Sequence, residues 1–372
     1  MQRWCKYSPE LILLAFVILF LVFKNPRNSW DRVINSDGKG YYAYLPALFI
    51  YHDLDYRFVE SYESKYYPPD KSMFKEFRTT ADGKTVNKCF PGLAILWLPF
   101  FLAAHLLSLI LGFAPDGYSI IYQLAIAAAA LFYLWLGCRI LFRLLVNAGA
   151  SVCLSGWITV VTGLGTNLIF FTIVEGSMTH VYSFAVVTAF LFCLERLFRT
   201  AHPWWFLPAA GLFGLMVIIR PTNGILLLMV PFFSNGWKHF KEIAGKMRER
   251  PATLFFGFIL LVNLLCIPVA FWQAKTGQWI INPYGNEFFD FRNPHFFSIL
   301  FSYNRGWFLY TPVAFASMAG FIGLFRESRW KFSWLLGFLV VFTFIASSWW
   351  MWYYASKCGQ RVFIDIYAVV PC

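Results

Sequence analysis

The stretch ATLFFGFILLVNLLCIPVAFWQA, residues 252–274, contains no charged residue. About 20 consecutive apolar residues are enough for a helix to cross the roughly 30 Å hydrocarbon core of a bilayer. Comparable segments recur along the chain, so the sequence predicts a membrane protein with many crossings. The candidate segments are 10–23, 91–113, 117–138, 150–173, 178–198, 203–219, 221–237, 252–274, 307–325 and 332–354.

The composition of the whole chain supports this prediction. Of the 372 residues, 59% are hydrophobic and only 13% are charged, whereas soluble domains are about half apolar and about a quarter charged. Lipid leaves no backbone polar group unpaired, and no barrel pattern is present in the sequence. We therefore expect an all-α, multi-pass transmembrane helix bundle, with residues 1–372 forming a single membrane domain.

The net charge of +12 predicts sidedness and gives no reason to expect a nucleic-acid partner. Lys and Arg lie between apolar segments, and such basic loops face the cytoplasm in membrane proteins. The groups expected inside are Arg139 with Arg143, Arg196 with Arg199, 238–250 and 326–331. We expect a plasma (cell inner) membrane protein with 174–180, the Arg220 corner, 275–306 and 356–361 on the extracytoplasmic side.

The front of the chain holds a long hydrophilic region, residues 24–90, which we expect to be the first outer loop after an uncleaved first helix. Within it, 40–52 alternates apolar and aromatic residues on a helical face and predicts a helix lying in the interface plane. Only one crossing fits between this loop and Arg139, yet two apolar segments follow. We expect 91–113 to be juxtamembrane or re-entrant, with two ordinary crossings as the alternative.

The end of the chain and the cysteines leave alternatives open. Segment 362–372 is too short to cross a bilayer, so it is interfacial or the chain is shorter than the protein from which it derives; we favour the second. Cys89 and Cys358 are both expected outside. They could form a disulfide, but two thiols are the favoured interpretation.

Ionisable residues gather at the outer ends of the predicted crossings and in the outer loops. Such groups are often functional near a membrane, although loop residues can simply be solvated. Taken alone, the Asp-Gly pair in NSDGKG is above all a turn signal or a helix cap. The residues in this set are Asp37, Lys88, Glu175, His180, Arg220, Arg305, Lys357 and Arg361.

The order of features resembles the polytopic GT-C glycosyltransferases, which include the protein O-mannosyltransferases and the lipid A aminoarabinose transferases. In that family an acidic residue follows the first helix and precedes a tyrosine; SDGKGYY matches with Asp37 and Tyr41, and Gly38 stands where a second acid is common. Lys88 in NKCFPG, the basic corner CRILFR and the outer segment FFTIVEGSMTHVYSF follow in the family's order. The resemblance covers roughly residues 8–200, and YNRGWFLYTP and GQRVFID are similar to later segments of bacterial members.

The resemblance implies a membrane enzyme that moves a hexosyl or pentosyl group from a polyprenyl-phosphate donor to a glycan, lipid or protein acceptor outside, with inversion. Asp37 would be the general base, a contribution of about 10²–10⁴ in rate. Arg and Lys suit the phosphate, in the expected order Arg305, Arg361, Lys357 and Lys88.

The other site residues have more than one possible role. Arg220 would reach a headgroup or only snorkel from a helix end, and His180 would orient the acceptor or be a satisfied interfacial histidine. Glu175 would bind the acceptor or form a structural pair. Some members of the family bind a divalent metal ion here, but a single acidic residue in each outer segment supplies few ligands for one.

Two further functions remain open at this point. The chain could be a transporter or flippase of a lipid-linked or hydrophobic anion, with the outer cations selecting substrate; the sequence shows no inverted repeat of the kind common in such carriers. It could also be an inactive relative, because the second acid is missing. The aromatic cluster 347–354 is interpreted as an interfacial belt.

Overall fold

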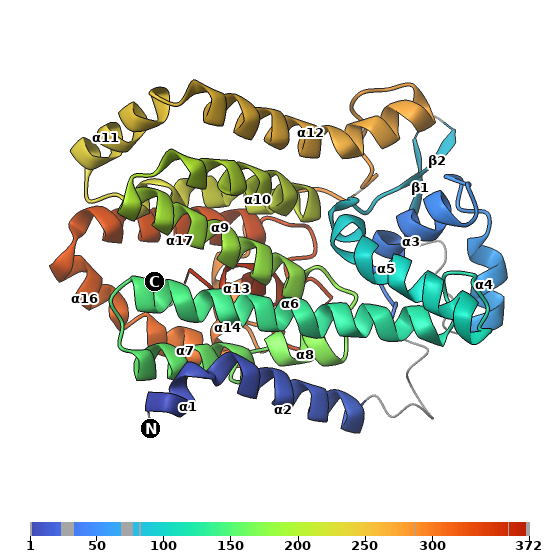
Figure 1. Cartoon of the computed structure of the whole chain (residues 1–372), viewed down its shortest axis with the longest axis horizontal. Helices are drawn as coiled ribbons and strands as arrows, with labels where there is room; N and C mark the ends of the chain where they lie inside the picture. The colour runs from blue at the N-terminus through green and yellow to red at the C-terminus, as the bar shows by residue number, and fades with distance from the viewer. Residues whose placement is uncertain are drawn as a thin grey trace.

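The computed structural model describes residues 2–23, 33–67, 77–81, 83–285, 287–355 and 357–369. Within these residues the chain is an all-α bundle with one small antiparallel hairpin (Figure 1), so the predicted fold class is confirmed at that level. The longer helices are α2 (Ser8–Phe23), α5 (Gly92–Leu111), α6 (Ile120–Asn147), α7 (Val152–Leu164), α9 (His180–Thr200), α10 (Phe206–Ile219), α12 (Pro251–Thr276) and α17 (Arg329–Ser347).

The remaining elements are short. The α-helices among them are α1 (Gln2–Lys6), α3 (Gly38–Phe49), α4 (Val59–Tyr66), α8 (Leu168–Ile173), α11 (Trp237–Arg248), α13 (Phe296–Phe301), α14 (Trp307–Tyr310), α15 (Pro312–Ser317) and α16 (Gly320–Glu327). The 3₁₀ segments and strands are η3 (Pro203–Trp205), η4 (Pro221–Met229), η5 (Pro231–Phe233), η6 (Arg361–Ile366), β1 (Arg78–Ala81) and β2 (Lys84–Asn87).

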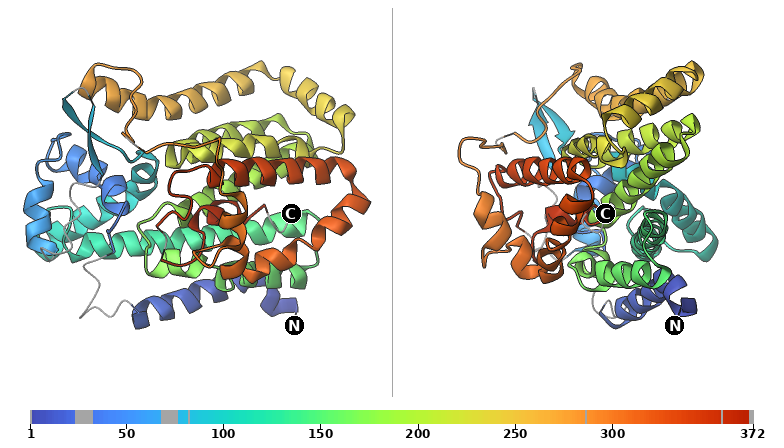
Figure 2. Two further views of the ribbon diagram at one scale, coloured as in Figure 1. Left: turned by 180° about the vertical axis from the view of Figure 1, so that it is seen from behind. Right: turned by 90° about the vertical axis from the view of Figure 1, so that its left-hand side faces the viewer.

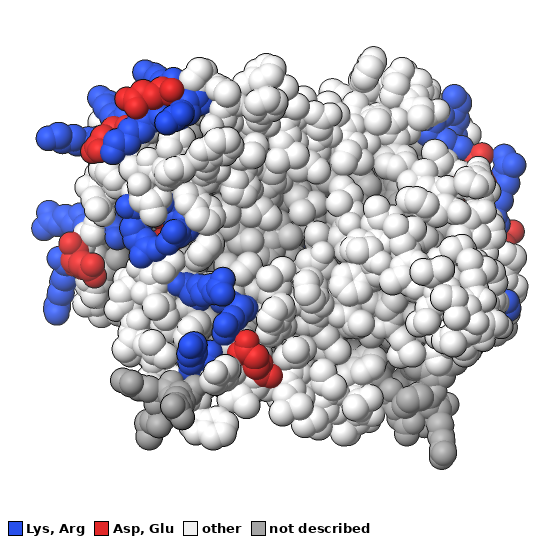
Figure 3. Space-filling model, viewed as in Figure 1, with Lys and Arg blue, Asp and Glu red and all other residues white. Residues whose placement is uncertain are grey.

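Five helices in the described part of the chain are long and apolar enough to cross a membrane: α5, α6, α9, α12 and α17. Figure 3 shows a broad face without charged residues between two ends at which charges gather, one of them over α11. This arrangement supports the predicted transmembrane bundle. The kind of membrane and the side that each end faces stay predictions.

Three expected crossings are wrong as single helices. Segment 150–173 divides into α7 and α8 around Gly165, and 221–237 is largely 3₁₀ helix with prolines at the first positions of η4 and η5. Segment 307–325 forms the short helices α14, α15 and α16. Proline disfavours the α conformation in the residue before it, and Thr311, which precedes Pro312, has the non-helical angles φ −136° and ψ 69°.

Helix α5 tests the expectation for 91–113. It is one continuous helix of 20 residues, so the re-entrant form of that expectation is not supported. It runs antiparallel to the first half of α6, because Tyr133 donates to the Leu96 carbonyl and His105 Nδ1 lies 2.6 Å from the Tyr122 hydroxyl. Its first residue, Gly92, packs against the backbone at the end of α10. The expectation that α5 lies beside the membrane without a full crossing stays a prediction.

A compact unit that we call the tyrosine cap, residues 33–67 and 77–90 as described, lies at one end of the bundle, opposite α11 (Figures 1 and 2). The predicted helix at 40–52 is present as α3, but its tyrosines are buried in protein instead of lying at an interface: Tyr42 is 0% exposed and Tyr44 4%. Tyr42 donates to the Gly117 carbonyl at 2.6 Å, and Tyr44 to that of Cys89 at 2.7 Å.

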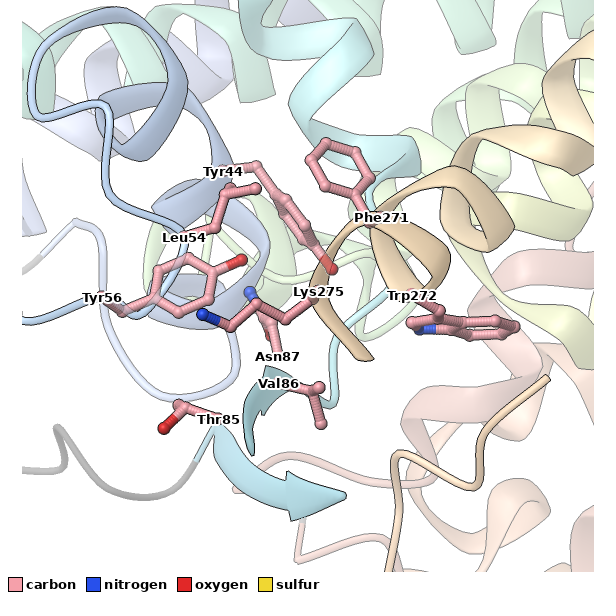
Figure 4. A pocket seen from close by; sticks show the side chains of 9 residues that line it. All are labelled: Tyr44, Leu54, Tyr56, Thr85, Val86, Asn87, Phe271, Trp272 and Lys275. Carbon is pink, nitrogen blue, oxygen red and sulfur yellow. The ribbon is translucent and has the colours of Figure 1, made fainter. Parts of the chain in front are cut away.

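The end of α12 fastens this cap to the bundle. Lys275 forms an ion pair with Asp55, and Figure 4 shows Lys275 beside Tyr44, Tyr56 and Asn87 around a cavity of about 20 Å³. A cavity of that size has room for about one water molecule. It is too small to be a substrate site.

The last described segment is a correction to an expectation. Residues 362–369 lie in the core, and Phe363, Ile364 and Asp365 are all 0% exposed. The ring of Phe363 stacks on Trp307 with centroids 4.0 Å apart. The interfacial alternative for 362–372 is therefore wrong for its described part, because η6 fills the middle of the bundle.

Candidate functional site

Several helix ends meet near η6 and bring charged side chains together. His180 is the first residue of α9, and Arg220 follows the last residue of α10. Asp365, on η6, faces both: its Oδ1 lies 3.1 Å from His180 Nδ1, and its Oδ2 lies 3.1 Å from Arg220 Nη1. These three groups come from segments far apart in the sequence and form one buried triad.

The triad is more deeply buried at the carboxylate than at the arginine. The side chains of Asp365 and His180 are 1% and 2% exposed, whereas that of Arg220 is 16% exposed. The contact from Arg220 to Oδ2 has ion-pair distance without hydrogen-bond geometry, so Oδ2 has no hydrogen-bond partner among the described residues. A buried carboxylate is costly to leave uncompensated, which makes the arginine necessary to this arrangement.

The histidine nitrogen in the triad has two neighbours. His180 Nδ1 lies 3.1 Å from Asp365 Oδ1 and 3.2 Å from Arg220 Nη1. One ring nitrogen cannot donate and accept at once, and a carboxylate paired with arginine only accepts. A proton on Nδ1 would satisfy the carboxylate and would leave Nε2 of a neutral His180 as the acceptor.

Asp37 lies beside this triad through Arg361, the first residue of η6. It occupies the N-cap position of α3, yet its side chain makes no capping hydrogen bond. Its Oδ2 lies 3.4 Å from Arg361 Nη2, and the two side chains are 36% and 19% exposed. The carboxylate is thus not used as a cap and is accessible at the surface of the cluster.

Close packing explains the glycine that follows Asp37. A Cβ on Gly38 would lie 2.1 Å from Ser177 Oγ and 2.8 Å from the Ser177 carbonyl oxygen. The same serine hydroxyl accepts from the Asn35 backbone N–H at 3.2 Å. A second acid at position 38 has no space, so its absence is a consequence of how the 174–179 loop packs on the start of α3.

A second acidic residue of that loop pairs with the same C-terminal segment. Glu175 is 4% exposed and its Oε1 lies 3.2 Å from Lys357 Nζ, whose side chain is 66% exposed. Segment 357–361 therefore supplies one cation to Glu175 and another to Asp37. The structure brings together Asp37, Glu175, His180, Arg220, Lys357 and Arg361, six of the residues singled out from the sequence.

Tyr41 and Lys88 flank this cluster. Burial raises the pKa of the Tyr41 phenol well above its usual value; Cys89 and Asp37 raise it further, and Arg220 lowers it. Burial also raises the pKa of the Cys89 thiol, with Asp37 as the next cause. Lys88 Nζ lies 2.9 Å from Glu287 Oε1. Tyr41 is therefore a protonated hydrogen-bond donor near Asp37, and Lys88 is already paired.

Arg305 is the predicted residue that the structure does not bring into the cluster. Its guanidinium lies over the ring of Tyr353, 5.5 Å from the centroid, and its backbone has φ +72°. Cys89 and Cys358 are not joined in a disulfide. Within the described ranges, no group of three or more His, Cys, Asp or Glu side chains could hold a metal ion.

Sequence reasoning missed Asp365, which holds the triad together. The signal is present in VFIDIY, where one acid interrupts an apolar run. Such a residue marks either a buried pair or a functional site. Its partners come from α9 and α10, and nothing near Asp365 in the sequence identifies them.

Comparisons with known proteins add nothing to this geometry: no family model, curated protein or solved structure matches the chain.

Proposed function

We propose that this protein is a membrane glycosyltransferase that moves a sugar from a polyprenyl-phosphate donor to an acceptor hydroxyl, with inversion and with Asp37 as the general base. The observation that carries the proposal is the pair of Asp37 with Arg361 at the edge of the triad. It places an accessible carboxylate next to a cation suited to phosphate.

The cations fit an anionic leaving group. Arg361 and Arg220 lie around Asp37 and Tyr41, whereas Arg305 lies elsewhere on Tyr353. We therefore propose Arg361 first and Arg220 second as the phosphate ligands, with Lys357 as an exposed third. The planar fork of arginine matches two phosphate oxygens at once.

The proposed step is a single displacement. The acceptor hydroxyl loses its proton to Asp37 while its oxygen forms a bond to the anomeric carbon, and the bond from that carbon to the phosphate oxygen breaks. The prenyl phosphate departs as an anion, which arginine stabilises. Donor phosphate would compete with Asp37 for Arg361, so donor binding would release the carboxylate to act as a base.

The buried triad has a supporting role in this proposal. Asp365 offsets part of the charge of Arg220 and fixes the tautomer of His180, in the way that a carboxylate orients a histidine in other sites. Tyr41 would donate a hydrogen bond to the sugar or the phosphate. Glu175, paired with Lys357, would border the acceptor side.

The test compares Asp37→Asn with the matched control Glu60→Gln. Glu60 is another acid of the tyrosine cap, and its side chain is 67% exposed. Each purified protein is given a radiolabelled polyprenyl-phosphate sugar and a membrane extract of acceptors, and donor binding is measured separately. We expect transfer by Asp37→Asn to fall about 10²–10⁴-fold with donor binding retained.

Two results would contradict the proposal. Unchanged transfer by Asp37→Asn would remove Asp37 as the base. Movement of labelled donor across a sealed vesicle membrane, with no transfer in any variant, would instead identify a carrier of lipid-linked anions.

A further inference from the structure

A large apolar cavity lies at the opposite end of α9 and α10 from the polar cluster. Its volume is about 420 Å³, within the usual range of ligand pockets. It begins at Phe190, ten residues from His180 and so about 15 Å along the helix axis. No step of the proposed transfer uses it.

The walls of this cavity come from four helices and the end of η4. They include Phe198 on α9, Ala210 on α10, Ile243 and Ala244 on α11, and Leu261 on α12, and no lining residue is charged or polar. A void of this size is destabilising in proportion to its volume. Apolar cavities stay dry and accept apolar ligands, so hydrocarbon is the fitting occupant.

Helix α11 covers the cavity with one face and carries cations on the other faces. Phe240, Ile243, Ala244 and Met247 line the cavity at the i, i+3, i+4, i+7 spacing of a helical stripe. The same helix carries Lys238, Lys241, Lys246 and Arg248 against a single acid, Glu242. This combination is typical of helices that lie on anionic lipid.

A further cation, Arg196, lies next to the cavity. Arg196, on α9, has its guanidinium over the Trp205 ring at 5.2 Å, and Trp205 packs against the cavity residues Phe198 and Ile243. Its buried Nε has no hydrogen-bond partner among the described residues. A buried donor normally has a hydrogen-bond partner, so an acceptor atom from a ligand would satisfy this nitrogen.

We infer that this cavity is a binding site for an anionic phospholipid of the surrounding bilayer. One acyl chain fills the space beneath α11, and the phosphate headgroup lies among Arg196, Lys241 and Arg248. The lipid would hold α11 against α9 and α10. The site is separate from the donor site, and the inference does not depend on glycosyltransfer.

The test measures lipid retention by native mass spectrometry. The full-length protein is delipidated in detergent and incubated with phosphatidylglycerol or with phosphatidylethanolamine carrying the same acyl chains. We expect phosphatidylglycerol to be retained preferentially. Lys241→Gln with Arg248→Gln should reduce that preference roughly tenfold or more, because each cation near an anionic lipid contributes appreciably. Arg326→Gln with Lys331→Gln, at the junction of α16 and α17, is the matched control.

Filling the cavity tests the acyl chain separately. Ala210→Phe and, independently, Ala244→Phe should each abolish retention of both lipids, whereas Ala316→Phe on the exposed surface of α15 should not. Ala244 lies on the partly exposed α11, so this variant keeps the test valid if Ala210→Phe fails to fold. Retention unchanged in both filled variants would overturn the site, and equal retention of the two wild-type lipids would overturn the headgroup assignment.

Discussion

The two ends of α9 and α10 differ in what fills the interior of the bundle: charged side chains at one end and an apolar cavity at the other. At one end, His180 Nδ1 and Arg220 Nη1 each lie 3.1 Å from a carboxylate oxygen of Asp365, so the buried charge has a cation beside it. At the other end, the same helices border about 420 Å³ of apolar space, and the charges lie outside it on α11.

This difference teaches where rigidity and adaptability belong in the molecule. Stability at the polar end depends on geometry, because a buried charge is compensated only while its partner stays in place. Stability at the cavity end depends on how well the volume is filled, because the free energy gained by burying apolar surface does not depend on direction. We expect substitutions at the polar end to be severe and comparable ones at the cavity end to be mild.

The largest effect on stability is expected for Asp365→Ala. It leaves the arginine charge of the triad uncompensated, and breaking a buried pair from one side destabilises by about 3–5 kcal/mol. The Tm of the purified protein in detergent measures this loss. Asp365→Asn keeps an acceptor for His180 and should lose less.

The matched control is Lys246→Gln, which breaks the ion pair with Glu242 on α11, where the two side chains are 41% and 57% exposed. Exposed pairs contribute about 0–1 kcal/mol, so its Tm should stay near that of the wild type. Equal losses for Asp365→Ala and Lys246→Gln would show that the triad does not anchor its end of the bundle.

A smaller effect is expected for Gly38→Ala. The added Cβ would overlap Ser177, whose Oγ lies 2.1 Å from its position, and overpacking a tight contact destabilises by about 1–3 kcal/mol. Adding Ser177→Gly should restore part of the Tm, because it removes the overlapping side chain.

The counterpart at the cavity end is Gly245→Ala on α11, where a Cβ would meet no atom within 4 Å. Replacing a helical glycine by alanine gains up to about 1 kcal/mol. A loss at Gly245 as large as the loss at Gly38 would remove the contrast between the two ends.

The effect that is smallest at neutral pH appears only in alkali. Burial raises the pKa of Tyr62 and Tyr118 well above 10.0. Tyr118, just before α6, stacks on Tyr62 of the tyrosine cap with ring centroids 3.5 Å apart. Above pH 10 the unfolded phenols lose protons that the folded ones keep. The stability is therefore full below pH 10 and falls as the pH rises beyond it. Circular dichroism and tyrosinate absorbance should report this loss together.

Tyr62→Phe with Tyr118→Phe is the check on that assignment. It removes both phenols, so the alkaline decrease in Tm should become shallower than in the wild type. The cavity lining contains no titratable side chain, so the alkaline decrease should not originate there. An alkaline decrease of unchanged steepness would exclude these two tyrosines as its cause.

Local patterns predicted the helical segments well. Apolar runs such as 252–274 and 178–198 became α12 and α9, because length and composition decide whether a membrane helix forms. The points at which an apolar segment divides into shorter helices were harder to predict. Segment 307–325 is apolar throughout its first half, yet Pro312 and the packing around Trp307 divide it. The cap's hairpin, β1 with β2, lacks an apolar alternation that would have indicated it.

The site was predictable as residue types but not as a set of contacts. Sidedness alone gathered Asp37, Glu175, Arg220 and Arg361 at one end. Their pairing depends on tertiary placement of 357–369, whose short length gave no sign that it would lie in the core. The same limit applies to Asp365, because its partners are set by where α9 begins and α10 ends.

The pairing of Asp37 with Arg361 also has a consequence for biosynthesis. The two residues are 324 positions apart. A ribosome that adds about 5–20 residues per second therefore needs about 15–65 s between them. During that interval the carboxylate has already been synthesised while its arginine has yet to be translated. The nascent chain would thus begin membrane insertion without the completed pair, and it would acquire the proposed phosphate site only after Arg361 is added.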